Sequence, residues 1–402
     1  MIKHMFLLLC LLSGLVLLTG CWDHRESGDI ALVMGMGIDK MEEDNLYRVS
    51  FQIVNPGQVA GGKRGQGQGT AVTTYSETGS TIFETVRKIS KKVPRLLSFS
   101  HTVVLVIGED LATEGGLPKI LDFTERYYDF RSTALVLVAK EGQALPILSV
   151  LTPLERIPAM KIQETVQKTE KVWGETPQRN INDVVQTISS KSKGLSLGGI
   201  SIAGNLTEGQ TSANTKRAVP TTLVKVSGLA LFKDGKLKGW LEDKEARGVA
   251  WIQNKIKKTV LSSKCKENKS TMAVEVLRSS TELKVSVAHG KPKMTISIRG
   301  EGHLEEITCP IDLTQPKQIF QLNNTFESEI KQEVTTAVKT AQEQKNDIFG
   351  FGEAINRANP KAWKEMAKQW DETFADMEVQ VNVKFFIRGI GLRKQPLILQ
   401  KK

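Results

Sequence analysis

The residues best suited to chemistry stand close to the N-terminus. The sequence Leu18-Thr19-Gly20-Cys21 has the pattern of a bacterial lipobox, which is a branched apolar residue, two small residues and a cysteine. Small residues let a peptidase approach that backbone closely, and a cysteine thiol is a nucleophile that can carry diacylglycerol. We therefore expect cleavage before Cys21 and lipidation of that cysteine.

The residues before this lipobox support the prediction. An apolar run over residues 5–18 has the length of a signal-peptide core and is too short to span a hydrocarbon layer of about 30 Å. An ordinary signal peptide and an uncleaved anchor are the alternatives. A diacylglyceryl thioether with a further N-acyl chain anchors a protein stably, whereas a single acyl chain binds only marginally. We expect a chain held at the outer face of a membrane, with this lipid on Cys21 and no other cofactor.

Other patterns resemble reactive sites only in part. Residues 57–64 are one residue short of a phosphate-binding loop, but Arg64 replaces the hydroxyl that would bind Mg²⁺, so residues 57–69 are expected to form a flexible loop. His289 and His303 stand near acidic residues, where a metal is conceivable but solvated histidines at strand ends are favoured. No pair of carboxylates stands out for acid–base catalysis. The sequence therefore predicts neither an enzyme nor a metal site.

The cysteines leave one question open. Of the four, Cys10 would be lost with the signal peptide and Cys21 would be lipidated, which leaves Cys265 and Cys309. In an exported chain these two can form one disulfide, and two buried free thiols are the alternative.

Aromatic residues near the C-terminus are candidates for docking a partner. Trp363 and Trp370 are seven residues apart, so both would lie on one face of a helix expected over residues 360–377. Core packing is favoured for this pair, and an exposed pair that docks on a protein or lipid is the alternative. Phe349 and Phe351 alternate with glycines, and that turn can either present the rings to a partner or place them beneath a long helix.

The elements that must position these residues follow from apolar periodicity. In the first half of the chain strands alternate with helices, which is typical of a sheet with helices packed on it. Strands are expected over residues 30–38, 46–54, 70–76, 102–107 and 133–138, and helices over residues 81–89, 117–128 and 144–151.

The second half predicts a different arrangement. Residues 206–222 have the composition of an exposed linker, and the Asp234-Gly235 pair predicts a hairpin between residues 223–232 and 236–241. Further strands alternate apolar and polar residues, and a long helix carries an apolar stripe from Ile319 to Ala341. The predicted class is α+β, with three domains of mixed sheets and packed helices. The expected divisions are a signal peptide (1–20), an N-terminal α+β domain (21–205), a linker with a small hairpin-helix unit (206–258) and a C-terminal sheet with a long helix (259–402).

Composition limits the partners. The chain of 402 residues has a formal net charge of +11, but cations and acids are interspersed and no basic stripe interleaved with aromatic residues stands out. We therefore expect no nucleic-acid partner. Positive charge is compatible with anionic lipid beside a tethered protein. No other apolar stretch approaches transmembrane length.

Several stretches together resemble one family, the Ger(x)C spore germination proteins, which are lipoprotein C-subunits of nutrient germinant receptors. The resemblance runs in order from Cys21 to about Leu392, and the Gly/Gln-rich loop over 57–69 and the stretch over 206–222 depart from the family pattern. The stretches that carry it are Cys21-Trp22-Asp23-His24-Arg25-Glu26, residues 30–40, residues 100–109, residues 227–241, Arg247-Gly248, residues 346–355 and the helix with Trp363 and Trp370.

This resemblance implies a fold, partners and a role. It implies a three-domain α+β fold and a receptor in the spore inner membrane that also contains a polytopic A-type subunit and a transporter-like B-type subunit. Such receptors respond to nutrients and start germination. The expected function is thus a non-enzymatic receptor subunit. One alternative is a tethered solute-binding lipoprotein that feeds a transporter, although the chain lacks two similar halves; another is an extracytoplasmic hydrolase, which would need a catalytic constellation.

One local feature makes a further prediction. Gly35 and Gly37 stand inside a predicted strand, where glycine normally weakens pairing. We expect another backbone to approach closely at these two positions.

Overall fold

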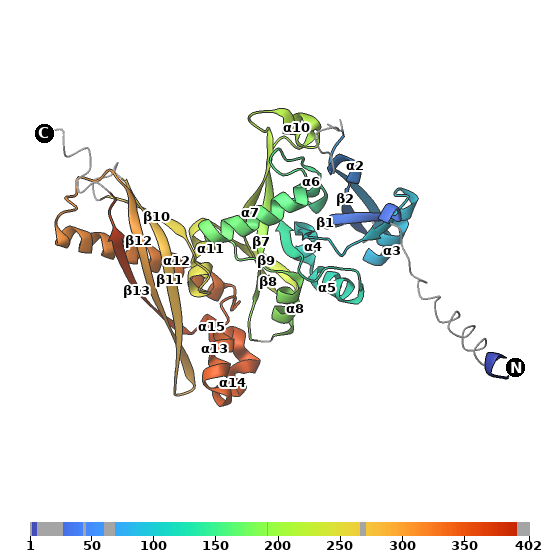
Figure 1. Ribbon diagram of the computed structural model, residues 1–402. Coiled ribbons are helices and arrows are strands. Elements are labelled where there is room, and N and C mark those ends of the chain that lie inside the picture. Colours follow the sequence, from blue (N-terminus) through green and yellow to red (C-terminus); the bar gives the residue numbers. More distant parts are fainter. Residues whose placement is uncertain are drawn as a thin grey trace.

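The computed structural model describes residues 2–5, 27–42, 46–59, 69–190, 192–265 and 271–391. Within them the chain forms a nine-stranded sheet and a four-stranded sheet. Figure 1 shows the two sheets toward opposite ends of an elongated molecule, with the last strands of the large sheet in the middle. The predicted α+β class is confirmed. Within the described residues, no helix is long and apolar enough to cross a membrane.

The large sheet is mixed. Its central strands are parallel and buried on both faces, which explains their unbroken apolar sequences. Antiparallel strands follow on both sides. In spatial order the strands are β3 (Val72–Gly79), β2 (Tyr47–Val54), β1 (Ile30–Lys40), β5 (Val104–Gly108), β6 (Leu135–Ala139), β7 (Leu195–Gly204), β8 (Thr222–Lys233) and β9 (Lys236–Leu241), and β4 (Leu96–Ser98) pairs with β1 outside this path.

Helices cover both faces of the large sheet and form two separate cores. Alternate residues of β5 point to opposite faces, so that Leu105 belongs to one core and Val104 to the other. One face is covered by α3 (Ile82–Lys88), η2 (Ile89–Lys91), α4 (Glu109–Glu114), α5 (Leu117–Arg126) and α8 (Ile181–Ser189), and the other by α6 (Ala144–Ser149) and α7 (Pro158–Val172). The short segments η1 (Ser27–Asp29) and α2 (Pro56–Val59) precede β1 and follow β2.

The glycines within β1 lie close against other segments, but the nearest atoms belong to side chains and not to the backbone that the sequence predicted. A Cβ at Gly37 would lie 2.9 Å from the Cβ of Ala144 and 3.4 Å from its carbonyl carbon, so the start of α6 leaves no room for a side chain. Asp39, two residues further, accepts hydrogen bonds from the Ala144 and Leu145 amides at 2.6 and 3.1 Å. Its carboxylate is thus placed at the positive end of that helix.

Residues 206–258 do not stand apart from the large sheet. The stretch predicted as an exposed linker contains α9 (Leu206–Gly209) and α10 (Ser212–Lys216). Asn214 there is buried and donates to the carbonyls of Leu151 and Thr222, which orders the stretch. The predicted hairpin is confirmed, with positive φ at Asp234 and Gly235. Its first strand pairs with β7, so the hairpin extends the large sheet. The proposed domain limits stay predictions.

The second sheet carries the long helix that the apolar stripe predicts. The helix α12 (Pro316–Glu343) buries Leu322, Phe326, Ile330 and Val334 against it. Glu327 and Asn323 accept hydrogen bonds from backbone amides of the edge strand, at 3.0 Å each. The strand order is β10 (Thr259–Lys264), β11 (Thr271–Ala288), β12 (Lys291–Ile307) and β13 (Glu378–Gly389).

Two further sequence questions are answered in this unit. Cys265 and Cys309 form a disulfide, with Cα atoms 6.0 Å apart. The single helix expected over residues 360–377 is wrong. It is divided into α14 (Pro360–Met366), η3 (Ala367–Gln369) and α15 (Trp370–Ala375), because the backbone leaves helical geometry at Gln369, where φ is −121° and ψ is 29°.

Candidate functional site

The most elaborate polar arrangement lies where the two sheets meet. The third core joins Leu229 and Leu231 of the large sheet to α11 (Asp243–Ile252), α12 and the second sheet. Around this apolar joint, buried polar groups connect segments far apart in sequence. We take this joint, with the pocket beside it, as the candidate functional site.

The turn after α12 is organised by one buried carboxylate. Asp347 Oδ1 accepts hydrogen bonds from the amides of Phe349, Gly350 and Phe351 at 3.2, 2.9 and 3.1 Å, and Oδ2 accepts from Gly352 at 2.8 Å. Gly350 has φ 84°, which a residue without a Cβ adopts readily. Burial raises the pKa of the Asp347 carboxyl to about 6, against the four amide hydrogen bonds, which lower it. The carboxylate thus fixes the start of α13 (Phe351–Ala358).

The same turn is bonded to the large sheet. The amide of Gly194, just before β7, donates to the carbonyl of Asp347 at 2.7 Å. Asn346 Nδ2 donates to the carbonyl of Phe232 in β8 at 3.1 Å. A Cβ at Gly194 would lie 1.9 Å from Asn346 Oδ1, so only glycine lets the two segments approach this closely. Gln253 Nε2 adds a bond to the carbonyl of Ile348 at 2.9 Å.

A buried ion pair holds α11 against α12. Arg247 and Glu333 are 4% and 2% exposed, and Arg247 Nε donates to Glu333 Oε2 at 2.9 Å while its Nη2 donates to Oε1. The indole of Trp251 donates to the same carboxylate at 3.1 Å. Burial alone would lower the pKa of Arg247, but the bonds and charge of Glu333 outweigh it and raise that pKa. A Cβ at Gly248 would lie 2.3 Å from the Glu333 carbonyl oxygen, so the helices touch through that glycine.

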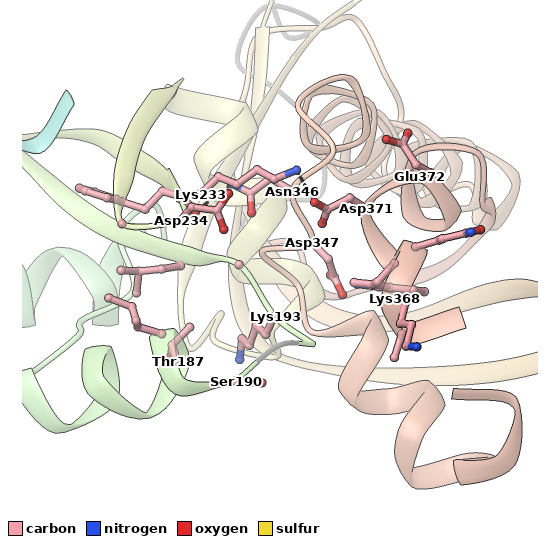
Figure 2. Close-up of a pocket in the computed structure, with 18 of the residues that line it drawn as sticks. Thr187, Ser190, Lys193, Lys233, Asp234, Asn346, Asp347, Lys368, Asp371 and Glu372 are labelled. Atoms are coloured by element: carbon pink, nitrogen blue, oxygen red, sulfur yellow. Dashed lines mark hydrogen bonds and ion pairs between the residues drawn. The ribbon is translucent and has the colours of Figure 1, made fainter. Parts of the chain in front are cut away.

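A pocket of about 530 Å³ opens at the joint. Figure 2 shows its labelled side chains on two sides, with Lys193 and Lys233 on segments of the large sheet and Asp371 and Lys368 on the C-terminal segments. Lys233 Nζ crosses the opening to an ion pair with Asp371 Oδ2 at 2.6 Å and donates to the carbonyl of Lys345 at 2.9 Å. The pocket therefore sits on the connection between the two parts of the molecule.

The chemistry of this pocket is that of binding and positioning. Burial lowers the pKa of Lys193, and the charge of Glu353 opposes that effect. Asp347 is buried, and both of its carboxylate oxygens accept amide hydrogen bonds that hold the turn. Within the described ranges, no group of three or more His, Cys, Asp or Glu residues could hold a metal ion. Charges of both signs line the opening and suit a small polar ligand or a polar segment of a partner.

The candidate docking aromatics pack beside this joint. Phe351 is fully buried, Phe349 and Trp370 are 5% and 4% exposed, and Trp363 is partly buried. The rings of Phe349 and Phe351 stack with centroids 5.1 Å apart, and those of Trp363 and Trp370 lie edge to face at 5.2 Å. In this conformation the rings form part of the third core. Docking of a partner by these four residues stays a prediction, and Cys21 lies outside the described residues.

The sequence also contains a G-x-S-x-G motif, which is typical of hydrolases. Residues 194–198 read Gly-Leu-Ser-Leu-Gly, which matches the G-x-S-x-G pattern of a hydrolase nucleophile. The structure places Ser196 inside β7, paired with Leu231 of β8, where it is buried. A nucleophile elbow requires a sharp strand-to-helix turn that exposes the serine. The motif here continues into strand β7, and its first glycine, Gly194, donates a hydrogen bond to Asp347 at the joint.

Comparisons with known proteins agree with this architecture. Residues 23–202 match the family described as spore germination protein N-terminal domain, and residues 227–391 match spore germination B3/GerAC like, C-terminal. Spore germination protein KC of Bacillus subtilis (strain 168) is 35% identical over 406 residues, which covers 100% of both chains. Spore germination protein B3 of the same organism is 24% identical and covers 94% of this chain and 96% of its own.

A solved structure shares the fold. The crystal structure of the GerBC protein superimposes with a TM-score of 0.56 at 19% sequence identity, over 88% of this chain and 97% of that chain. Most residues of the joint, from Phe232 to Asp371, lie within the second matched region, and Lys193 and Gly194 lie within the first. The resemblance seen in the sequence is confirmed, and the chain belongs to the GerAC-like family of spore germination proteins.

Proposed function

We propose that this spore germination protein is a non-enzymatic lipoprotein subunit of a nutrient germinant receptor. Lipid on Cys21 tethers it to the outer face of the spore inner membrane. There it supports the assembly and signalling of a polytopic A-type subunit and a transporter-like B-type subunit, which together trigger germination.

The observation that carries this proposal is the buried polar joint. The hydrogen bonds of this joint connect the large sheet, α11, α12 and the turn after α12, through Asn346, Asp347, Arg247 and Glu333. The chain is also similar along its whole length to a spore germination protein. Such a joint fixes the relative position of two surfaces, as a scaffold or a signalling subunit requires. The same residues are not arranged as a nucleophile, a base and an oxyanion site.

The joint also suits signal transfer. The pocket is lined by residues of both parts of the molecule, so a ligand or a partner segment bound there would contact both parts. Lys233 and Asp371 connect the two parts across the opening itself. A change at this ion pair would therefore reach both sheets.

The test is a tagged pull-down from gently solubilised spore membranes, with an untagged strain as the control. Recovery of one A-type and one B-type subunit supports the proposal. Recovery of the protein alone, or together with an unrelated permease of the ABC type, refutes it and favours the solute-binding lipoprotein. In that case, titration of small metabolites into the purified protein would give tight binding.

A further inference from the structure

The densest positive charge outside the joint lies between α3 and β4. Residues 87–96, here called the basic segment, contain Arg87, Lys88, Lys91, Lys92 and Arg95 and no acidic residue. Four of these five side chains are exposed, and Lys88 is half-buried. Such a local concentration differs from the interspersed charges of most of the chain.

Three of these cations are available to a partner. Lys88 forms an ion pair with Glu84 at 2.6 Å and Lys92 with Glu77 at 3.0 Å. In the described part of the chain, no acidic side chain pairs with the other three, which are Arg87, Lys91 and Arg95. Arg87 instead lies over the ring of Phe83, with its guanidinium carbon 4.9 Å from the centroid.

Apolar side chains are exposed beside these charges. Leu96 is 52% exposed and Phe83 is 46% exposed. Cations next to exposed leucine and phenylalanine are the combination that binds at the interface of an anionic bilayer, where the cations meet the headgroups and the apolar groups enter the acyl boundary.

The topology places this surface at the tethered end of the protein. Leu96 pairs with Ile30 at the start of β1, so Arg95 lies at the edge where the chain enters the sheet. Figure 1 shows α3 near β1, at the end of the molecule opposite to β10–β13. Five residues lie between Cys21 and Ser27, and the six steps from one Cα to the other span at most about 20 Å when fully extended. A lipid on Cys21 would thus hold the basic segment close to the bilayer.

We infer that the basic segment, with Leu96 and Phe83, is a membrane-facing surface that binds anionic phospholipid and orients the protein on the bilayer. This inference rests on the proposed tether for its geometry, but the binding itself does not require the lipid. It places the four-stranded sheet and the joint away from the membrane surface.

The test uses the mature chain from residue 21 with Cys21→Ser, which cannot be acylated. The removal of residues 1–20 leaves every core residue that the structure describes, since the first of these is Ala31. Co-sedimentation is measured with vesicles of phosphatidylcholine alone and with about one third phosphatidylglycerol. The expected result is binding to the anionic vesicles only, weakened by added salt.

Two variants distinguish the effect of where the positive charges lie from the effect of total net charge. Replacement of Arg87, Lys91 and Arg95 by glutamine is expected to lower partitioning about fivefold per charge, on the order of a hundredfold in total. The matched control replaces Arg357, Lys361 and Lys364 by glutamine. These exposed residues lie on α13 and α14, and the control makes the same change in net charge with little expected effect.

The outcomes are distinguishable. Equal losses in both variants, or equal binding to neutral vesicles, overturn the inference, and circular dichroism confirms that each variant is folded. The tether is tested separately, by mass spectrometry of the Cys21 peptide from membranes. An unmodified Cys21 would refute the proposed lipid anchor. It would not affect the vesicle result, because that assay uses a chain without the lipid.

Discussion

Gly248 offers the sharpest test of the joint. In an exposed helix, Gly→Ala stabilises by about 1 kcal/mol, because alanine has the higher helix propensity. In α11, however, a Cβ would lie 2.3 Å from the Glu333 carbonyl oxygen and 2.7 Å from the Cβ of Ala337, whereas real Cβ contacts essentially never fall under 3.0 Å. The two helices must therefore separate by at least 0.7 Å, the difference between 3.0 and 2.3 Å.

That separation has a cost that can be worked out. Overpacking strain is about 1–3 kcal/mol. Movement of Glu333 also weakens its bond with Arg247, a hydrogen bond between charged groups of about 1.5–3 kcal/mol. If that bond is lost and the gain in helix propensity of about 1 kcal/mol is subtracted, Gly248→Ala should lower the free energy of unfolding by about 1.5–5 kcal/mol.

The assay is urea unfolding followed by tryptophan fluorescence, in which the fully buried Trp251 reports on this helix pair. Gly57→Ala is the matched control, since Gly57 lies in the helix α2 and a Cβ there would meet no atom within 4 Å. The control should be neutral or slightly stabilising. If Gly248→Ala behaves like the control, α11 and α12 are not locked at this point and the reasoning about the joint is refuted.

Three further predictions concern the same unit. For Asp347, the folded-state pKa of about 6 lies above the ordinary value of 3.8, so its contribution to stability is present below pH 4 and is lost as the pH rises to 6. The difference in unfolding free energy between wild type and Asp347→Asn should change by about 3 kcal/mol over that window, and a constant difference would contradict the burial argument. Phe351→Ala should cost about 3–5 kcal/mol of stability, because the ring is fully buried; if thermal unfolding is unchanged and receptor assembly alone is lost, the ring docks on a partner. Joint replacement of Cys265 and Cys309 by serine should lower the unfolding free energy by about 2–4 kcal/mol, and an unchanged urea midpoint under oxidising conditions would argue against a disulfide in solution.

Elements with a local signature were predictable from the sequence. The stripe on α12 repeats at helical spacing, and the Asp234-Gly235 pair fixes its hairpin through two positive φ values, so neither depends on distant residues. Tight packing at Gly35 and Gly37 was also predictable, because glycine inside a strand needs a steric reason, although side chains and not a backbone make the closest contacts. In each case the residues of one short segment are enough to predict the feature.

The joint was not predictable for the opposite reason. Arg247 and Glu333 are 86 residues apart and Asn346 and Phe232 are 114 apart. From the sequence alone, Arg247, Glu333 and Asn346 would each be expected to be solvated. The break in the helix over residues 360–377 likewise has no proline or glycine nearby that would have predicted it. Tertiary contacts decide such positions, and a single sequence does not contain them.

The stretches that resemble the family acquire a physical meaning once the joint is known. Asn346 and Asp347 connect to Gly194 and Phe232, and Arg247 with Gly248 connects to Glu333. Gly194 and Gly248 lie where two segments touch, and the buried polar side chains of the joint each form a hydrogen bond with a partner. Because an uncompensated buried charge costs several kcal/mol, the loss of one partner affects the whole joint. These residues thus act as one unit that sets how the nine-stranded sheet and the four-stranded sheet are placed relative to each other.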